Sequence, residues 1–81
     1  GTIRVTPTDR LIERLRRERV SADAADVRRL LESFGWTFAG QRGSHLRFVK
    51  QGQSAIVYPL KHGRRVRAVY VKQILKRIAE D

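Results

Sequence analysis

The first apolar residues of the chain recur at the spacing of a helix. A narrow apolar stripe runs through an otherwise charged segment and predicts an amphipathic helix over about residues 7–19. Its members are Leu11, Ile12 and Leu15. Thr6 is placed to cap this helix, and Pro7 suits its first position, where the N–H has no partner within a helix. We therefore expect the helix to begin at the Thr6–Pro7 step.

Two further segments show the same period. In one, apolar residues fall at i, i+3, i+4 and i+7, and these are Val27, Leu30, Leu31 and Phe34. Ser21 is the expected cap of this second helix, and Gly35 stands where a left-handed residue ends a helix. The other segment predicts a helix through to the end of the chain, with Val71, Ile74, Leu75 and Ile78 as its stripe.

Between these helices the apolar period changes to 2, which indicates strands. The expected strands are 36–39, 45–49 and 54–58. Residues 40–43 read as a turn, Pro59 ends the third strand, and residues 60–67 read as a basic loop. The order α-α-β-β-β-α predicts a two-layer α+β domain, with three antiparallel strands covered on one face by helices.

Size and composition narrow the class of protein. With 81 residues, about 41% of them apolar, residues 1–81 are expected to form a single domain around one core. The chain has no cysteine, which excludes disulfides and zinc sites of the cysteine type. The longest uncharged stretch, residues 51–60, is about half as long as the roughly 20 residues of a membrane-spanning helix. We expect a cytoplasmic protein with no membrane association and no cofactor.

Charge is distributed unevenly along the chain. The formal net charge is +10, and residues 33–79 hold ten Lys and Arg, both histidines and no Asp or Glu. All eight acids lie outside this segment, at Asp9, Glu13, Glu18, Asp23, Asp26, Glu32, Glu80 and Asp81. A long basic segment without carboxylates attracts polyphosphates, so nucleic acid is the expected ligand.

A histidine lies inside this basic segment, at the entrance to the second strand. Because strand side chains alternate, His45 and Arg47 should share one face while the apolar residues beside them point to the core. Arg42 precedes them, and the backbone amides of Gly43 and Ser44 in the turn are placed to approach a phosphate. The pattern therefore predicts one group able to transfer protons beside guanidinium charge.

Such a group has two interpretations. The His45 imidazole can abstract the 2′-hydroxyl proton of RNA or protonate the leaving 5′-oxygen, with Arg42 or Arg47 stabilising the charged transition state. Alternatively, a lone histidine at a turn is a surface or hydrogen-bonding residue, and Ser44 is a turn residue. Two histidines and no carboxylates in the segment are too few ligands for zinc or magnesium, so any cleavage should be independent of metal.

A second basic group follows the third strand. Its members are His62, Arg64, Arg65, Arg67 and, on the last helix, Lys72. They form either a clamp for phosphates or a solvated basic loop. Trp36 and Tyr58 are candidates for stacking on bases, although Trp36 is better explained as core.

Several of these residues occur together in a known family. The motifs are Leu30-Leu31-Glu32 with Phe34-Gly35-Trp36, then Arg42-Gly43-Ser44-His45, a hairpin, Pro59, His62-Gly63-Arg64 and Tyr70-Val71-Lys72-Gln73-Ile74-Leu75. This pattern resembles the HicA (YcfA-like) toxins over about residues 21–78. The chain is then expected to consist of an N-terminal helix at about 7–19 followed by a HicA-like core at about 21–80. In this chain His62 stands one position later than the histidine of the family's Val-Pro-x-His segment.

The resemblance implies a fold, an activity and a partner. The fold is like that of double-stranded-RNA-binding domains, α-β-β-β-α, and the activity is that of an mRNA interferase in a toxin–antitoxin system. The family's catalytic histidine corresponds to His45. The implied partner is an acidic HicB-type antitoxin that covers the His45 site.

Two other functions remain open at this point. A non-catalytic binder of double-stranded RNA with the same fold should bind duplexes and leave them uncut. A protein-interaction module should bind RNA weakly even at low salt and recognise a partner rich in Asp and Glu.

Overall fold

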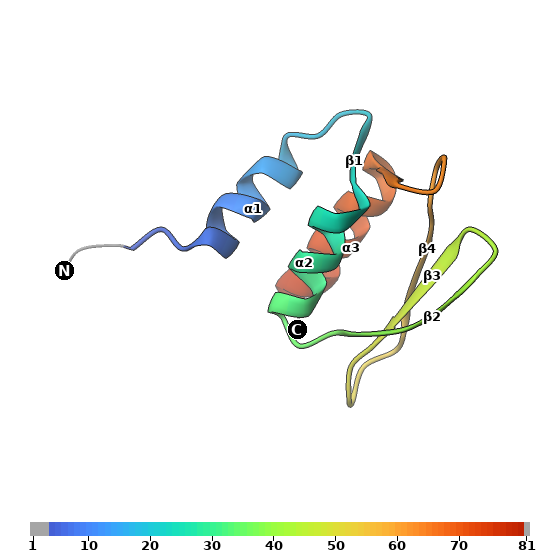
Figure 1. Cartoon of the computed structure of the whole chain (residues 1–81). Coiled ribbons are helices and arrows are strands. Elements are labelled where there is room, and N and C mark those ends of the chain that lie inside the picture. The colour runs from blue at the N-terminus through green and yellow to red at the C-terminus, as the bar shows by residue number, and fades with distance from the viewer. Residues whose placement is uncertain (1–3, 81) are drawn as a thin grey trace.

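The computed structural model describes residues 4–80, in which three helices and five short strands form an α+β fold. In chain order the elements are α1 (Pro7–Arg16), β1 (Ser21–Asp23), α2 (Ala24–Ser33), β2 (Thr37–Arg42), β3 (His45–Val49), β4 (Ile56–Pro59), β5 (Arg65–Arg67) and α3 (Ala68–Glu80). α2 and α3 lie between α1 on one side and the β2–β4 sheet on the other (Figure 1). The predicted two-layer α+β core, α-β-β-β-α with an extra N-terminal helix, is confirmed.

The start of α1 follows the sequence prediction, and its end does not. The Thr6 hydroxyl accepts a hydrogen bond from the Asp9 amide (3.1 Å), and the Asp9 carboxylate accepts one from the Thr6 amide (3.0 Å). These bonds favour the ionised carboxylate and lower the pKa of Asp9 below its ordinary value. The helix ends at Arg16 rather than at residue 19, because the chain then turns into β1.

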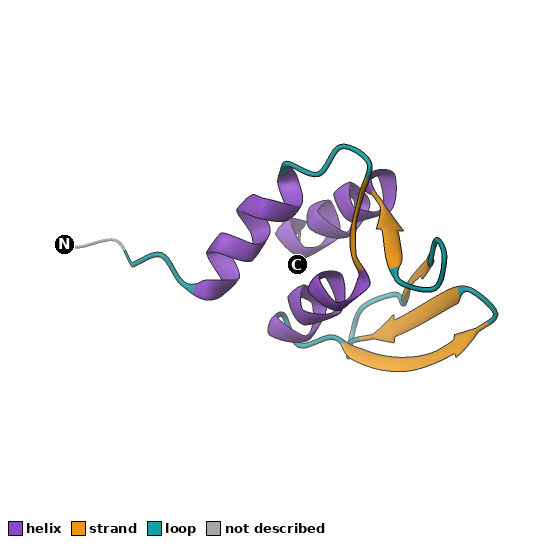
Figure 2. Ribbon diagram, turned by 45° about the horizontal axis from the view of Figure 1, so that its top comes forward, coloured by secondary structure: helices purple, strands orange, loops and turns teal. Residues whose placement is uncertain are grey.

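The expected helix cap at Ser21 is wrong. Asp23 caps α2, with its carboxylate accepting a hydrogen bond from the Ala25 amide at 3.0 Å. Ser21 instead begins β1, which pairs antiparallel with β5. The expected basic loop over residues 60–67 therefore ends in a strand, and the two strands form a second small sheet beside the helices (Figure 2). Each has three residues, too few for a period of 2 to be recognised.

The larger sheet has the antiparallel strand order β2-β3-β4. β2 runs to Arg42 and so includes residues 40–42, which the sequence pattern assigned to a turn. β4 begins at Ile56 and includes Pro59 as its last residue, where an edge strand tolerates the missing N–H. A tight turn at Gly43 and Ser44 joins β2 to β3.

The core lies between the inner face of this sheet and the helices α2 and α3, and it extends to α1 and to the small β1–β5 sheet. Its buried residues are Leu11, Leu15, Ala22, Val27, Leu30, Leu31, Trp36, Leu46, Phe48, Ile56, Tyr58, Val66, Val71, Ile74 and Ile78. Phe48 packs between two rings, edge-on to Phe38 (centroids 5.5 Å apart) and stacked on Tyr58 (5.9 Å). Trp36 and Tyr58 are 2% and 1% exposed, so neither ring is available for stacking on a base.

The Tyr58 hydroxyl gives a test of this core. It is buried, it forms no hydrogen bond with any described residue, and burial raises the pKa of Tyr58 to about 12. Because an unpaired buried hydroxyl is unfavourable, Tyr58→Phe should leave the free energy of unfolding unchanged or raise it by about 1 kcal/mol. Urea unfolding would measure this, with half-buried Tyr70→Phe as control. A loss of stability specific to Tyr58→Phe would contradict the packing described.

Candidate nucleic-acid interface

His45 is the first residue of β3, and its side chain lies on the outer face of the sheet. Leu46 and Phe48 are buried, whereas His45 and Arg47 are exposed, so the alternation predicted for this strand is present. The inner residues pack beneath the helices, and the outer ones therefore face solvent. His45 pairs with Arg42 on one side and with Pro59 on the other.

Arg42 reaches this face because β2 contains a bulge. Phe38 pairs with Phe48, but the register then shifts so that Gly40 pairs with Arg47 and Arg42 with His45. In a regular strand Arg42 would share the core face of Phe38, since the two are four residues apart. The one-residue shift moves it to the outer face, opposite His45. A glycine within a strand pattern, here Gly40 with φ 131°, was the signal in the sequence for this bulge.

The outer face holds an open groove of about 430 Å³. Its lining residues are Ala39, Gly40, Gln41, Arg42, His45, Arg47 and Val57. These residues combine two guanidinium groups, one imidazole and a small apolar surface, and they include no carboxylate. The groove can therefore attract an anion and place an imidazole beside it.

The turn beside His45 is held by contacts on both sides. The Gln41 side-chain amide donates to the Gly43 carbonyl at 3.0 Å, and the Leu60 amide donates to the Ser44 carbonyl at 2.7 Å. Gly43 has φ 59°, which an L side chain rarely adopts. These constraints fix where β3 begins and hence where His45 stands.

A second hollow of about 270 Å³ adjoins this turn. It is lined by Ser44, Pro59, Leu60, Lys61, Arg67 and Tyr70. Two of the predicted phosphate-binding residues, Ser44 and Arg67, thus meet here rather than in the groove of His45. Lys61 and Tyr70 line the same hollow and were missed as site residues. The sequence shows only that Lys61 belongs to a basic segment, and nothing in it indicates that Tyr70 of α3 would join that residue.

Two residues of the predicted clamp are engaged elsewhere. The half-buried Arg65 side chain donates to the Ser21 hydroxyl (3.1 Å) and to the Ser21 carbonyl (2.9 Å), so it joins β5 to β1. Lys72 points its ammonium group at the carbonyls of Arg16 and Glu18, both at 3.5 Å, beyond the end of α1. Neither residue lines the groove or the hollow.

The remaining two residues, His62 and Arg64, are exposed in the loop between β4 and β5. His62 adopts φ 53° and is followed by Gly63 at φ 75°. The Arg64 carbonyl accepts a hydrogen bond from the Ala24 amide (2.9 Å), which fastens the loop to the start of α2. Their side chains do not line the groove of His45, so the structure does not bring the two histidines together there.

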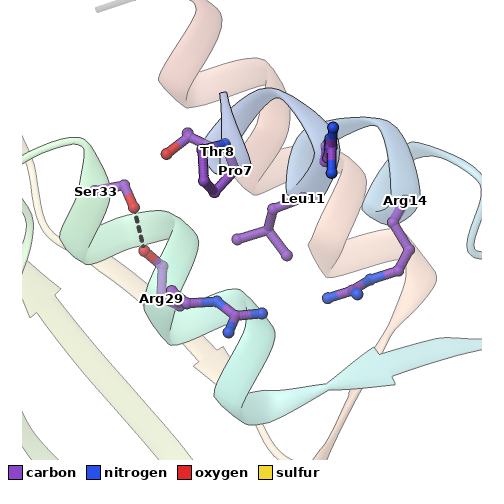
Figure 3. A pocket seen from close by; sticks show the side chains of 7 residues that line it. Pro7, Thr8, Leu11, Arg14, Arg29 and Ser33 are labelled. Carbon is purple, nitrogen blue, oxygen red and sulfur yellow. Dashed lines mark hydrogen bonds between the residues drawn. The ribbon is translucent and has the colours of Figure 1, made fainter. Parts of the chain in front are cut away.

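A further groove of about 360 Å³ lies between α1 and α2 (Figure 3). α1 itself lies on the side of the other helices away from the β2–β4 sheet (Figure 1). Its lining includes three arginines, Arg10, Arg14 and Arg29. Two of them pair with the same carboxylate, since Asp26 lies 3.0 Å from Arg14 and 2.7 Å from Arg29. This groove is lined by no histidine, and Asp26 partly neutralises the charge of its arginines.

Residues 4–80 support neither a metal site nor a membrane-spanning helix. No three side chains among His, Cys, Asp and Glu gather there in a way that could hold a metal ion. None of the helices in this range has the length and apolar character required to span a membrane.

The contacts of Arg65 yield a prediction about stability. Arg65→Met keeps the aliphatic stem and removes both hydrogen bonds to Ser21, so the free energy of unfolding should fall by about 1.5–3 kcal/mol. Arg64→Met is the matched control, because Arg64 is exposed and should tolerate the change. Thermal or urea unfolding would measure both. Equal stability of the two variants would show that the contacts with Ser21 do not hold β5 to β1.

Comparison with known proteins agrees with the motifs. A family model described as the HicA toxin of bacterial toxin–antitoxin matches residues 24–79. Comparisons with curated proteins and with solved structures gave no match. The matched range contains α2, the β2–β4 sheet with its groove and most of α3, whereas α1 and β1 precede it. With most of its residues inside that match, the chain belongs to the HicA family of toxins of bacterial toxin–antitoxin systems.

Proposed function

We propose that this toxin is an endoribonuclease that cuts mRNA in the cytoplasm without a metal ion and uses His45 for proton transfer. The observation that carries the proposal is the outer groove of the sheet, where Arg42 and Arg47 lie beside His45 and no carboxylate lines the walls. RNA is favoured over DNA because this chemistry needs the 2′-hydroxyl as nucleophile.

The reaction uses groups already present in RNA. The 2′-oxygen attacks the adjacent phosphorus, and the His45 imidazole accepts its proton. The bond from phosphorus to the 5′-oxygen breaks, and that oxygen takes a proton from water. The products are a 2′,3′-cyclic phosphate and a 5′-hydroxyl. The guanidinium groups of Arg42 and Arg47 stabilise the extra negative charge that develops on the phosphate oxygens.

The neighbouring basic residues bind the rest of the chain. Gly43 permits close approach of a phosphate to the turn, and the hollow with Lys61 and Arg67 provides charge for a flanking phosphate. His62 and Arg64 extend the same basic surface along an exposed loop. Lys72 and Arg65 contribute to it only through long-range charge, because their side chains have partners in the protein.

Exchange of the histidine tests the assignment directly. His45→Ala should lower the rate of mRNA cleavage by about 10²- to 10⁴-fold, the usual contribution of a general base. His62→Ala should retain most of the activity, since His62 does not line the groove. Denaturing gels of a defined mRNA, with circular dichroism as a check on folding, would measure both. A folded His45→Ala protein with normal cleavage would disprove the proposed role.

Removal of metal ions tests the chemistry independently. Cleavage should persist in excess EDTA, because no described set of ligands is suited to hold a metal. If EDTA stops the reaction and added Mg²⁺ or Mn²⁺ restores it, the mechanism proposed for His45 is wrong. Protein that binds RNA duplexes and releases no products in either condition would support the non-catalytic alternative.

We further propose that the antitoxin is a small acidic HicB-type protein, encoded beside the toxin, that covers the groove. Its carboxylates would meet the exposed charges of Arg42 and Arg47. Arg47→Glu should weaken the complex by about tenfold or more, and the association rate of the unmodified pair should fall steeply with salt.

Arg17→Glu is the control for that change, because Arg17 is exposed at the end of α1, away from the sheet (Figure 1). Surface plasmon resonance with the co-purified partner would compare the two variants. Equal weakening by both, or recovery of a partner without acidic character, would contradict this part of the proposal. Arg65 is unsuitable for the comparison because its loss affects folding.

A further inference from the structure

The groove beside His45 contains an apolar surface that proton transfer and phosphate binding do not use. Arg47 lies two residues after His45 in β3 and pairs with Gly40 in β2 and with Val57 in β4. Val57 is 51% exposed, although its neighbours Ile56 and Tyr58 are buried. A half-exposed valine beside Arg47 offers nothing to a phosphate, so this part of the groove is suited to another part of the ligand.

The surface around Arg47 is open enough to receive a flat group. Apart from Gly40 itself and its two chain neighbours, no heavy atom of the described residues lies within 4 Å of the position that a Cβ would take on Gly40, and the preceding Ala39 is small. Residues two apart on a strand are about 6.8 Å apart, so the surface around Arg47 begins about that far from His45. Arg47, which pairs with the glycine on one side and with the valine on the other, is exposed, and its guanidinium provides a planar cation.

We propose that this surface binds the base of a nucleotide adjacent to the phosphate that is cut. The base lies over the Gly40 backbone and the Val57 side chain, with the Arg47 guanidinium stacked against it. A base in a duplex is stacked and paired, so only an unpaired one can enter. The substrate is therefore single-stranded RNA, even though the fold is like that of double-stranded-RNA-binding domains.

This inference rests on the proposed function, because it takes His45 as the reacting group, but binding can test it separately. The substrate is a DNA oligonucleotide with a single ribonucleotide, so that only one phosphate can be cut. In two further versions the base is absent from the nucleotide on one side or the other of that phosphate, and the sugar of that nucleotide is retained. Each version is offered to the unmodified toxin, to Val57→Ala and to Val69→Ala.

Val69 is the matched control, since it is 56% exposed on α3 and does not line the groove. Removal of one of the two bases should lower kcat/KM of the unmodified toxin by about tenfold, as expected for loss of a stacked base. Val57→Ala should lower kcat/KM for the intact substrate by about fivefold, because two methyl groups leave the contact. It should have no effect on the substrate that lacks the bound base, and Val69→Ala should have no effect on either.

A second measurement tests base binding without cleavage, so that an error in the proposed subsite can be distinguished from an error in the proposed reaction. Fluorescence anisotropy gives the affinity of the His45→Ala protein, alone and combined with Val57→Ala, for all-deoxy versions of the three oligonucleotides. Base-dependent affinity that Val57→Ala removes supports the subsite even if the toxin cuts nothing. If the toxin cuts all three ribonucleotide-containing oligonucleotides with the same kcat/KM, the proposed subsite is wrong, whereas the proposed cleavage reaction is still supported.

Two further results would overturn the proposal. One is equal cleavage of the oligonucleotide after its complementary strand has been annealed, since pairing should keep the base out of the groove. The other is a Val57→Ala protein that handles all the oligonucleotides normally but binds the antitoxin more weakly, which would assign the valine to the protein partner.

Discussion

The packing of Leu46 and Phe48 against the helices determines which face of β3 meets solvent, and the rest of the site follows from that choice. Each of these side chains stabilises the fold by about 1.5–3 kcal/mol when it leaves water. A shift of the strand by one residue would expose both and bury His45 and Arg47 instead. The hydrophobic core therefore fixes the register, and the register holds the imidazole on the outside.

The bulge in β2 extends the same constraint to a second strand. Phe38 must stay on the inner face, where its ring meets that of Phe48. With that ring fixed, only an extra residue between Phe38 and Arg42 allows the arginine to face outward. Gly40 supplies a backbone conformation that other residues rarely adopt, and it also leaves the groove open above it. The bulge in β2 thus brings the charged Arg42 side chain to the outer face and also leaves open space in the groove.

The sequence was most informative where its pattern is long. The stripes of α2 and α3 and the alternation of β3 were predicted because each repeats a period several times. The exposure of His45 and Arg47 on the outer face was predicted from the same alternation. β1 and β5 were missed because three residues carry no period, and the placement of Ser21 as a cap failed because its segment pairs with a distant strand.

The basic loop shows why charge alone could not define the site. Arg64, Arg65 and Arg67 are indistinguishable in a run of basic residues, yet the pairing of β5 with β1 gives them different surroundings. Arg65 turns toward Ser21, Arg67 lines the hollow beside Ser44, and Arg64 remains in solvent. Only the tertiary contacts of two short strands decide among them.

These strands also explain how the N-terminal segment, which lies outside the family match, is joined to the rest of the protein. Ala22 and Val66 are paired and buried, and the Val20 carbonyl accepts a hydrogen bond from the Ala68 amide at the start of α3 (2.9 Å). Leu11 and Leu15 of α1 enter the same core. α1 therefore adds apolar contacts on the side of the helices away from the sheet (Figure 2), and it leaves the outer face open. In this arrangement the helices are stabilised from both sides while the basic groove stays exposed to solvent.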